Sequence, residues 1–221
     1  KEWGLWNLQI ESITPKECVL STQRTQDLIS QTDALPQKNP LKPIILYQCL
    51  PKGRKIDDII RIATEAGIAE IVLVHSKNCV ATYEGKEKGK LERFDSMVKE
   101  AIQQSGSIVP TKVTGVIELE DIPSHFEKAS SYTKDKKNVG LVLHQCVVKE
   151  DQKNLIDCLK NSNGTIGIVV GSEGGLTEEE CNFLINKNFN AILLNTNILR
   201  CETAGIYAIG AVQTIIENSC V

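Results

Sequence analysis

The sequence lacks the features that mark membrane proteins and proteins held together by disulfides or metals. None of its apolar runs approaches the ~20 residues of a membrane-spanning helix, and no signal-like segment opens the chain. Its eight cysteines form no C-x-x-C pair, and His75, His125 and His144 fall in no zinc-binding spacing. Most cysteines lie in or beside apolar runs, where a free thiol behaves as a small hydrophobe. These absences predict a protein of the reducing cytoplasm without a structural metal.

An excess of positive charge is also missing. The net charge is −3, whereas nucleic-acid-binding domains usually carry a basic surface. Any contact with RNA must therefore come from local basic groups, such as residues 52–55 and 86–90. The chain begins with Lys1, within strand-like sequence, so we expect the natural N-terminus to lie upstream.

What the sequence does contain is a pair of loops in its last quarter. An apolar, β-branched strand is expected at 165–170, followed by the glycine-rich turn 171–176. Thr177, with Glu180 three residues later, predicts a capping box at the start of a helix that ends near Asn186.

A second apolar strand is expected at 191–194 and runs into an irregular loop at 195–201. The final helix is expected to begin near Glu202, because apolar residues recur after it at helical spacing. Both loops follow the carboxyl ends of buried strands, which is where α/β proteins bind ligands.

The two loops together carry a family resemblance. Residues 171–175 (G-S-E-G-G) are similar to a G-P-E-G-G signature, and residues 198–204 (I-L-R-C-E-T-A) are similar to an I-L-R-x-E-T-A signature. The combination resembles the small-ribosomal-subunit rRNA uridine-N3 methyltransferases of the SPOUT superfamily. The resemblance implies an α/β fold in which a parallel sheet is flanked by helices and the C-terminal chain forms a trefoil knot.

The resemblance divides the chain at about residue 41. Residues 42–221 would form the SPOUT methyltransferase domain, and residues 1–41 would form part of a PUA-like β-barrel, with two strands joined at 14–16, and a linker. In the larger part, a strand at 44–49, a helix ended by Gly67 and a strand at 71–74 predict a βαβ unit with parallel strands. Further expected elements are a loop at 77–89, helices at 91–105 and 150–160, and a strand at 138–143.

The resemblance implies S-adenosyl-L-methionine as cofactor and methyl transfer to N3 of a specific uridine in 16S rRNA. Arg200 and Glu202 are the candidate catalytic residues: the guanidinium could stabilise a developing imide anion, and the carboxylate could orient the base or take its proton. Because its loop is apolar, we expect Arg200 to be buried. The implied cofactor-binding residues are Leu143, His144, Val170, Gly171, Glu173, Gly174, Gly175, Leu194, Asn195, Ile198, Leu199 and Ala204. The implied RNA-binding residues are Lys52, Arg54, Gln104 and Arg200.

The chain departs from the family at several positions. Ser172 replaces the proline of the first signature, and Asn195 stands where the second loop usually has glycine. Asn78, Ser107 and Asn197 stand where the family has arginines. Each replacement removes a guanidinium, the group suited to binding phosphates and base edges. Two alternatives stay open: a SPOUT ribose 2′-O-methyltransferase, which would share the knot and the cofactor but is disfavoured by the I-L-R-x-E-T-A stretch, and a non-catalytic RNA-binding descendant, which the lost arginines and the negative charge favour.

The expected partners are 16S rRNA or the small ribosomal subunit, and a second copy of the chain; no membrane is expected. SPOUT proteins dimerise through the knotted region, so we expect a homodimer with the last helix in the interface. Small and apolar residues at helical spacing would form the contacting face, namely Ala204, Ala208, Ala211 and Ile215.

Overall fold

The computed structural model describes residues 6–14, 17–24, 42–83, 87–130, 137–144, 154–160 and 162–218. The chain divides into two units, Lys1–Pro40 and Leu41–Val221. In the first unit, β1 (Trp6–Ile13) pairs antiparallel with β2 (Cys18–Arg24), as expected. Pro15 and Lys16 of the predicted turn lie outside the described residues. Because Ile10 and Ile13 are exposed, this hairpin resembles part of a larger sheet.

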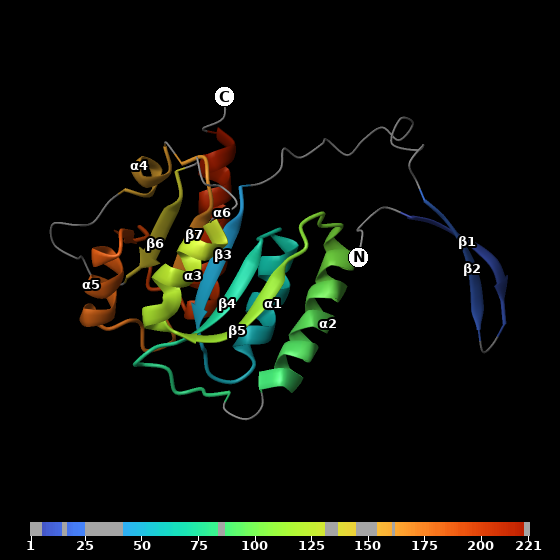
Figure 1. Ribbon diagram of the computed structural model, residues 1–221, viewed down its shortest axis with the longest axis horizontal. Helices are drawn as coiled ribbons and strands as arrows, with labels where there is room; N and C mark the ends of the chain where they lie inside the picture. The colour runs from blue at the N-terminus through green and yellow to red at the C-terminus, as the bar shows by residue number, and fades with distance from the viewer. Residues whose placement is uncertain are drawn as a thin grey trace. The chain divides into compact units, whose positions relative to one another are not determined.

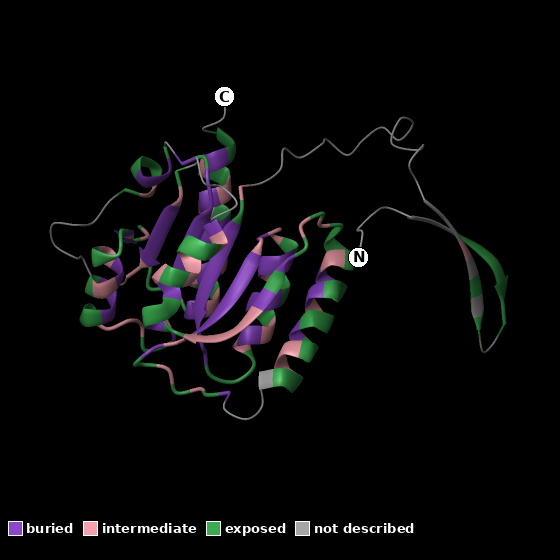
Figure 2. Cartoon of the chain, viewed as in Figure 1, coloured by how far each residue is buried: buried purple, intermediate pink, exposed green. Residues whose placement is uncertain are grey.

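The second unit contains a six-stranded sheet in the order β5-β4-β3-β7-β6-β8. Its strands are β3 (Ile44–Cys49), β4 (Glu70–His75), β5 (Lys112–Glu118), β6 (Val139–Leu143), β7 (Ile166–Val170) and β8 (Phe189–Ile192). Every neighbouring pair is parallel, which confirms the predicted architecture. The central strands are buried throughout (Figure 2), as apolar strands covered on both faces should be.

Helices cover both faces of this sheet (Figure 1). Residues of α1 (Lys55–Glu65), α2 (Glu87–Ser105), α4 (Leu155–Leu159) and α6 (Cys201–Asn218) pack in one apolar cluster. Residues of α3 (Ile122–Ala129) and α5 (Glu178–Asn186) pack in a second. Alternation along β3 divides its side chains accordingly: Leu46 joins the first cluster and Ile45 and Tyr47 join the second. In the part of the chain that the structure describes, no helix is long and apolar enough to span a membrane.

Several boundaries differ from those predicted. β8 ends at Ile192, so Leu193 and Leu194 belong to the following loop. The helix expected at 91–105 begins already at Glu87, and that expected at 150–160 is described only as Leu155–Leu159. β5 and α3 were not predicted from the sequence. β5 is a partly exposed edge strand interrupted by Gly115, so its hydrophobic signal is weak.

The predicted contact face of the last helix is already used inside the chain. Ala208 is 2% exposed and lies in the core, and Ala204 and Ile215 pack against that core. Ala208 is therefore not available to a second copy, whereas Ala204, Ala211 and Ile215 are half-buried. The reason is that α6 packs against β3, β7 and α1, near the middle of the sheet, rather than along its edge. The exposed residues of α6 recur on another side, at Thr203, Tyr207, Gly210, Thr214 and Glu217.

The cysteines behave as predicted. Those whose side chains the structure describes are free thiols, and Cys49, Cys158, Cys181 and Cys201 are buried. They fill small spaces in the packed interior.

A buried polar network attaches α3 to the sheet. The hydroxyl of Tyr47, which is fully buried, shares a 3.0 Å hydrogen bond with Nδ1 of His125. Nε2 of His125 lies 3.7 Å from Oε1 of Glu70, which also contacts Lys112 Nζ at 3.1 Å and the Thr114 hydroxyl. Burial raises the pKa of Tyr47 and lowers the pKa of His125.

Removing the Tyr47 hydroxyl should destabilise the fold. Tyr47→Phe leaves a half-buried imidazole nitrogen without this partner, and we expect a loss of about 1 kcal/mol in the free energy of unfolding. Urea titration followed by circular dichroism measures this loss. Tyr83→Phe is the matched control, since the Tyr83 hydroxyl makes no hydrogen bond with any residue that the structure describes. Equal losses in the two variants would contradict the structural role of the network.

Candidate functional site

The glycine turn, residues 171–175, lies at the point of the sheet where the connections reverse direction. It follows β7, which is placed between β3 and β6. Because the strands are parallel, their carboxyl ends lie at one edge, and a crevice forms where the order reverses. The turn therefore occupies the usual ligand-binding position of an open α/β sheet.

The conformation of the glycine turn follows from its residues. The amide of Gly175 donates to the carbonyl of Ser172 at 2.9 Å, and Gly175 has a φ of +68°, in the left-handed region that favours glycine. A Cβ at Gly171 would lie 2.9 Å from the backbone carbon of Gly175, so the chain approaches itself too closely for a side chain there. The turn is thus tightly closed before α5 begins.

The predicted capping box at the start of α5 is confirmed. The Thr177 hydroxyl oxygen accepts from the amide of Glu180 at 3.2 Å, and the Glu180 carboxylate accepts from the amide of Thr177 at 2.7 Å. Both bonds satisfy amides that would otherwise be unpaired at a helix start. The exit of the glycine turn is therefore also held in place.

The side chain of Gln48 connects β3 to the glycine turn. This buried side chain donates to the carbonyls of Cys49 at 3.0 Å and Gly171 at 3.4 Å. Its Oε1 has no hydrogen-bond partner among the described residues. A Cβ at Gly205 of α6 would lie 3.4 Å from this oxygen, so glycine at that position lets the helix pass closely over Gln48.

The glycine turn, the end of β6 and the loop 193–200 enclose a cavity of about 610 Å³. This volume lies within the ~300–1,000 Å³ of typical small-molecule sites. Of the predicted cofactor-binding residues, the structure brings together along this cavity Leu143, His144, Val170, Gly171, Glu173, Gly174, Gly175, Leu194, Ile198, Leu199 and Ala204. Asn195 is not among the lining residues. The lining also includes residues that were not predicted to bind the cofactor: Lys55, Ser172, Leu176, Ile192, Leu193, Thr196, Asn197 and Cys201.

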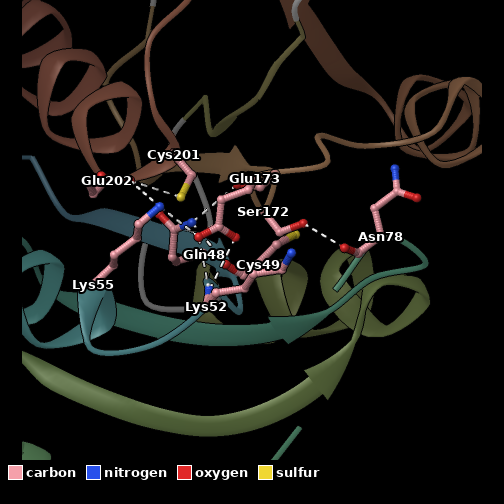
Figure 3. A network of polar contacts seen from close by, with 10 residues as sticks. Gln48, Cys49, Lys52, Lys55, Asn78, Ser172, Glu173, Cys201 and Glu202 are labelled. Atoms are coloured by element: carbon pink, nitrogen blue, oxygen red, sulfur yellow. Dashed lines mark hydrogen bonds and ion pairs between the residues drawn. The ribbon is translucent and has the colours of Figure 1, made fainter. Parts of the chain in front are cut away.

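Lys55 is the most consequential of the missed residues. Its Nζ lies 2.8 Å from Oε1 of Glu173 in the glycine turn and 3.5 Å from Oε2 of Glu202 in α6 (Figure 3). The carboxylate of Glu173 also accepts from the backbone amide of Lys52, at 3.0 and 3.2 Å. One ammonium group therefore connects the starts of α1 and α6 to the glycine turn. The basic group 52–55 was visible in the sequence, but only the fold shows that Lys55 faces these carboxylates.

The charges in this network shift one another's pKa values. Burial opposes ionisation of Glu173, but hydrogen bonds from Lys55 and from the Lys52 amide outweigh it and lower the pKa. Burial likewise opposes ionisation of Glu202, whose pKa is lowered by its backbone, Cys201 and Lys55. The hydrogen bond to Glu173 raises the pKa of Lys55. Burial, followed by its contact with Glu202, raises the pKa of the Cys201 thiol to about 12. Near neutral pH the network is ionised and Cys201 is a neutral donor.

Arg200 and Glu202 differ in exposure and in their contacts. Arg200 lines the cavity but is exposed, so the expectation of a buried arginine was wrong; the neighbouring Cys201 is buried instead. Glu202 is partly buried and pairs with Lys55 rather than with Arg200. The loop leaves the sheet edge here, and its side chains alternate between solvent and the body of the protein.

The predicted RNA-binding residues are not all gathered at the cavity. Lys52 lines a second cavity of about 410 Å³ that shares Glu173 and Gly174 with the first. Arg54 is exposed at the start of α1 and lines neither cavity. Gln104 lies in the last turn of α2, which runs back to the amino end of β5. It is therefore at the opposite edge of the sheet. Among the described residues, no group of three or more His, Cys, Asp or Glu could hold a metal ion.

Comparison with known proteins agrees with this geometry. The family model for the RNA methyltransferase domain matches residues 37–213. This fold and cavity therefore belong to the class of RNA methyltransferases. Ribosomal RNA small subunit methyltransferase E 2 of Borreliella burgdorferi is 30% identical over 183 residues, 82% of this chain and 70% of its own length. The Aquifex aeolicus methyltransferase E is 32% identical over 78% of this chain and 69% of its own length. The chain belongs to the ribosomal RNA small subunit methyltransferase E family.

A solved structure shares the fold. Ribosomal RNA small subunit methyltransferase E from Neisseria gonorrhoeae, bound to S-adenosyl methionine, is 28% identical, with a TM-score of 0.68. The match covers 81% of this chain and 69% of that one. The chain spans 64% of the length of the Mycobacterium bovis relative and 70% of that of the Borreliella burgdorferi relative, which is about two thirds of their length.

Replacing Lys55 should weaken the fold in a pH-dependent way. The lowered pKa values of Glu173 and Glu202 mean that their ionised forms stabilise the protein above the unfolded pKa of 4.5. That contribution is lost as the pH falls through the lowered folded values. Lys55→Met should therefore reduce the melting temperature most above about pH 5, with the difference from wild type shrinking at lower pH.

Lys77→Met is the matched control for Lys55→Met. It removes a 2.7 Å pair with Glu179 in which both side chains are largely exposed, so its effect should be smaller. Melting curves recorded from neutral to acidic pH compare the two variants. A pH-independent loss for Lys55→Met, or equal losses in both variants, would show that the network is not the source of stability.

Proposed function

We propose that this protein uses S-adenosyl-L-methionine to methylate N3 of a specific uridine in the 16S rRNA of the small ribosomal subunit. The observation that carries the proposal is the cavity formed by both signature loops at the carboxyl ends of β6, β7 and β8. It is supported by membership of the methyltransferase E family and by the S-adenosyl methionine in the Neisseria gonorrhoeae relative.

The cavity suits this cofactor. Its volume fits a nucleoside joined to an amino acid, and its walls combine exposed backbone with apolar side chains. The backbone of Gly171, Gly174 and Gly175 would bind polar edges of the ligand, and Leu194 and Leu199 would contact its apolar parts. When bound, S-adenosyl-L-methionine supplies a methyl carbon that its sulfonium makes electrophilic.

The chain's own residues would then prepare the uridine. Arg200 is exposed at the cavity, so an RNA base can reach its guanidinium, which would stabilise negative charge on the imide as the N3 proton leaves. Glu202 has a lowered pKa and is therefore a weak base, so we assign it the role of orienting its neighbours rather than removing the proton. Lys52 and Arg54 would contact the RNA backbone beside the glycine turn.

The proposal extends to the fold and the cellular setting. We infer that the C-terminal chain forms a trefoil knot; in support, α6 packs near the central strands although it follows the edge strand β8. We infer that residues 1–41 are part of a PUA-like β-barrel, which fits an antiparallel hairpin with exposed Ile10 and Ile13. With a ribosomal substrate, we infer that the protein acts in the cytoplasm.

The direct test is methylation of small ribosomal subunits that lack the modification. The purified protein and S-adenosyl-L-methionine are added, and the rRNA nucleosides are analysed by mass spectrometry. New 3-methyluridine supports the proposal. A new ribose methyl group would favour the 2′-O-methyltransferase alternative, and no product would favour the non-catalytic one.

Arg200 and Glu202 should act on the methyl-transfer rate rather than on cofactor binding. Arg200→Ala should slow single-turnover methylation by ~10²–10³, the usual cost of one preorganised donor, and Arg200→Lys should rescue little. Glu202→Gln should slow methylation less than Arg200→Ala does, if the carboxylate only orients its neighbours. Calorimetry should show that cofactor affinity changes little in both. Arg61→Ala, on the exposed side of α1, is the control. Wild-type rates in both variants would remove these residues from the mechanism.

We also propose a homodimer, formed through the exposed side of α6 and the loop before it. Ile198 is 83% exposed and Tyr207 is 48% exposed, although both are large and apolar. A stable interface there should bury more than ~1,000 Å² in total. Light scattering should show a dimer at micromolar concentration, and Tyr207→Glu should dissociate it. Val80→Glu adds the same charge to another exposed apolar residue and should leave the dimer intact. A monomeric wild-type protein would refute the proposal.

A further inference from the structure

The β4 loop, residues 76–80, is hydrogen-bonded to the glycine turn in both directions. The side-chain amide of Asn78 donates to the carbonyls of Gly174 at 3.0 Å and Gly175 at 3.3 Å. In return, the Ser172 hydroxyl donates to the carbonyl of Asn78 at 3.1 Å (Figure 3). The two segments are almost a hundred residues apart in the sequence, so only the fold brings them together.

The close packing at this contact explains one of the glycines. A Cβ at Gly174 would lie 2.9 Å from the Cβ of Asn78, closer than real Cβ atoms approach. Gly174 is therefore required by its neighbour in the protein and not only by a ligand. Glycine at this position lets the Asn78 amide reach the carbonyls of the turn.

A third contact fixes the β4 loop from the other end of the turn. The backbone amide of Lys77 donates to Oε1 of Glu180 at 2.8 Å. Glu180 is 4% exposed, and its second oxygen closes the capping box of α5. Residues 77 and 78 are thus attached to the glycine turn and to the first turn of α5.

Asn78 and Ser172 are two of the positions at which the chain departs from the family. From the sequence, Ser172 loses the rigidity of a proline, and Asn78 loses an arginine. In the structure the two residues bond to the same turn and to each other. Asn78 does not line the larger cavity, whereas the turn that it holds does. Asn78 lines the second cavity and reaches the wall of the larger one through its hydrogen bonds to the turn.

We propose that Asn78 is a positioning residue, which together with Ser172 holds the glycine turn in the conformation that binds the cofactor. The turn's carbonyls point to the β4 loop because the Asn78 amide binds them there, and this keeps the wall of the cavity in one arrangement. A preorganised wall costs less ordering when the ligand binds. The cofactor part of this inference rests on the proposed function.

The test is Asn78→Asp, which keeps the size of the side chain but replaces the donating amide by a carboxylate facing two carbonyls. Hydrogen exchange in the cofactor-free protein should become faster in the peptide that contains residues 171–176. Calorimetry should show a dissociation constant for S-adenosyl-L-methionine that is about tenfold higher, as expected for two ordinary hydrogen bonds. KM for the cofactor should rise with kcat nearly unchanged, because a binding contribution has been lost.

Asn190→Asp is the matched control. The Asn190 amide donates to the Gly140 carbonyl at 3.0 Å within the sheet, so this variant makes the same chemical change away from the turn. It should lower the melting temperature but leave exchange at 171–176 and the cofactor dissociation constant unchanged. Ser172→Ala should have a smaller effect than Asn78→Asp. The double variant should lose less binding free energy for the cofactor than the two single variants lose together, because both residues act on one contact.

Unchanged exchange at 171–176 in Asn78→Asp would overturn the proposal, and so would faster exchange with an unchanged dissociation constant. If the wild-type protein bound no S-adenosyl-L-methionine, the proposed function would fail. The exchange measurement needs no cofactor, so faster exchange would then still support the hold on the turn, and unchanged exchange would refute it.

Discussion

The structure around the cavity depends on the fixed conformation of one short turn after β7. Hydrogen bonds from three neighbouring elements reach it: Gln48 from β3, Lys55 from α1 and Asn78 from the β4 loop. Each bond comes from a segment far away in the sequence. A glycine-rich turn has many accessible conformations, and these contacts select one of them. The wall of the cavity is therefore determined by the packing of the sheet and of the helices around it.

The distribution of charge at the site follows from the same packing. Lys55 lies between Glu173 and Glu202, so two carboxylates near the cavity share one ammonium group and stay ionised. Arg200, by contrast, is exposed and has no ion pair with any residue that the structure describes. The site thus contains an inner network of paired charges, Lys55 with Glu173 and Glu202, and an outer cation, Arg200, at the surface. Under the proposed function, the paired charges would hold the wall of the cavity and the exposed guanidinium would contact the RNA.

The sequence predicted best the elements whose signals are local. The apolar run at 44–49 coincides with β3, and Thr177 and Glu180 make both bonds of the predicted capping box. β5 was missed because it is a partly exposed edge strand with a glycine in it. The predicted contact face of α6 includes Ala208 because helical spacing shows which residues share a face, but not what covers each of them. Ala208 lies in the protein's own core.

By itself, the sequence determined the α/β class, the positions of the two loops and the family resemblance. These depend on residue order, hydrophobic period and short motifs, which are properties of neighbouring residues. Only the tertiary structure decided that Lys55 bridges Glu173 and Glu202, that Arg200 is exposed, and that Asn78 bonds to the glycine turn. The physical reason is that these contacts join residues from different βα units. Their distances are set by strand order in the sheet, which no local pattern specifies.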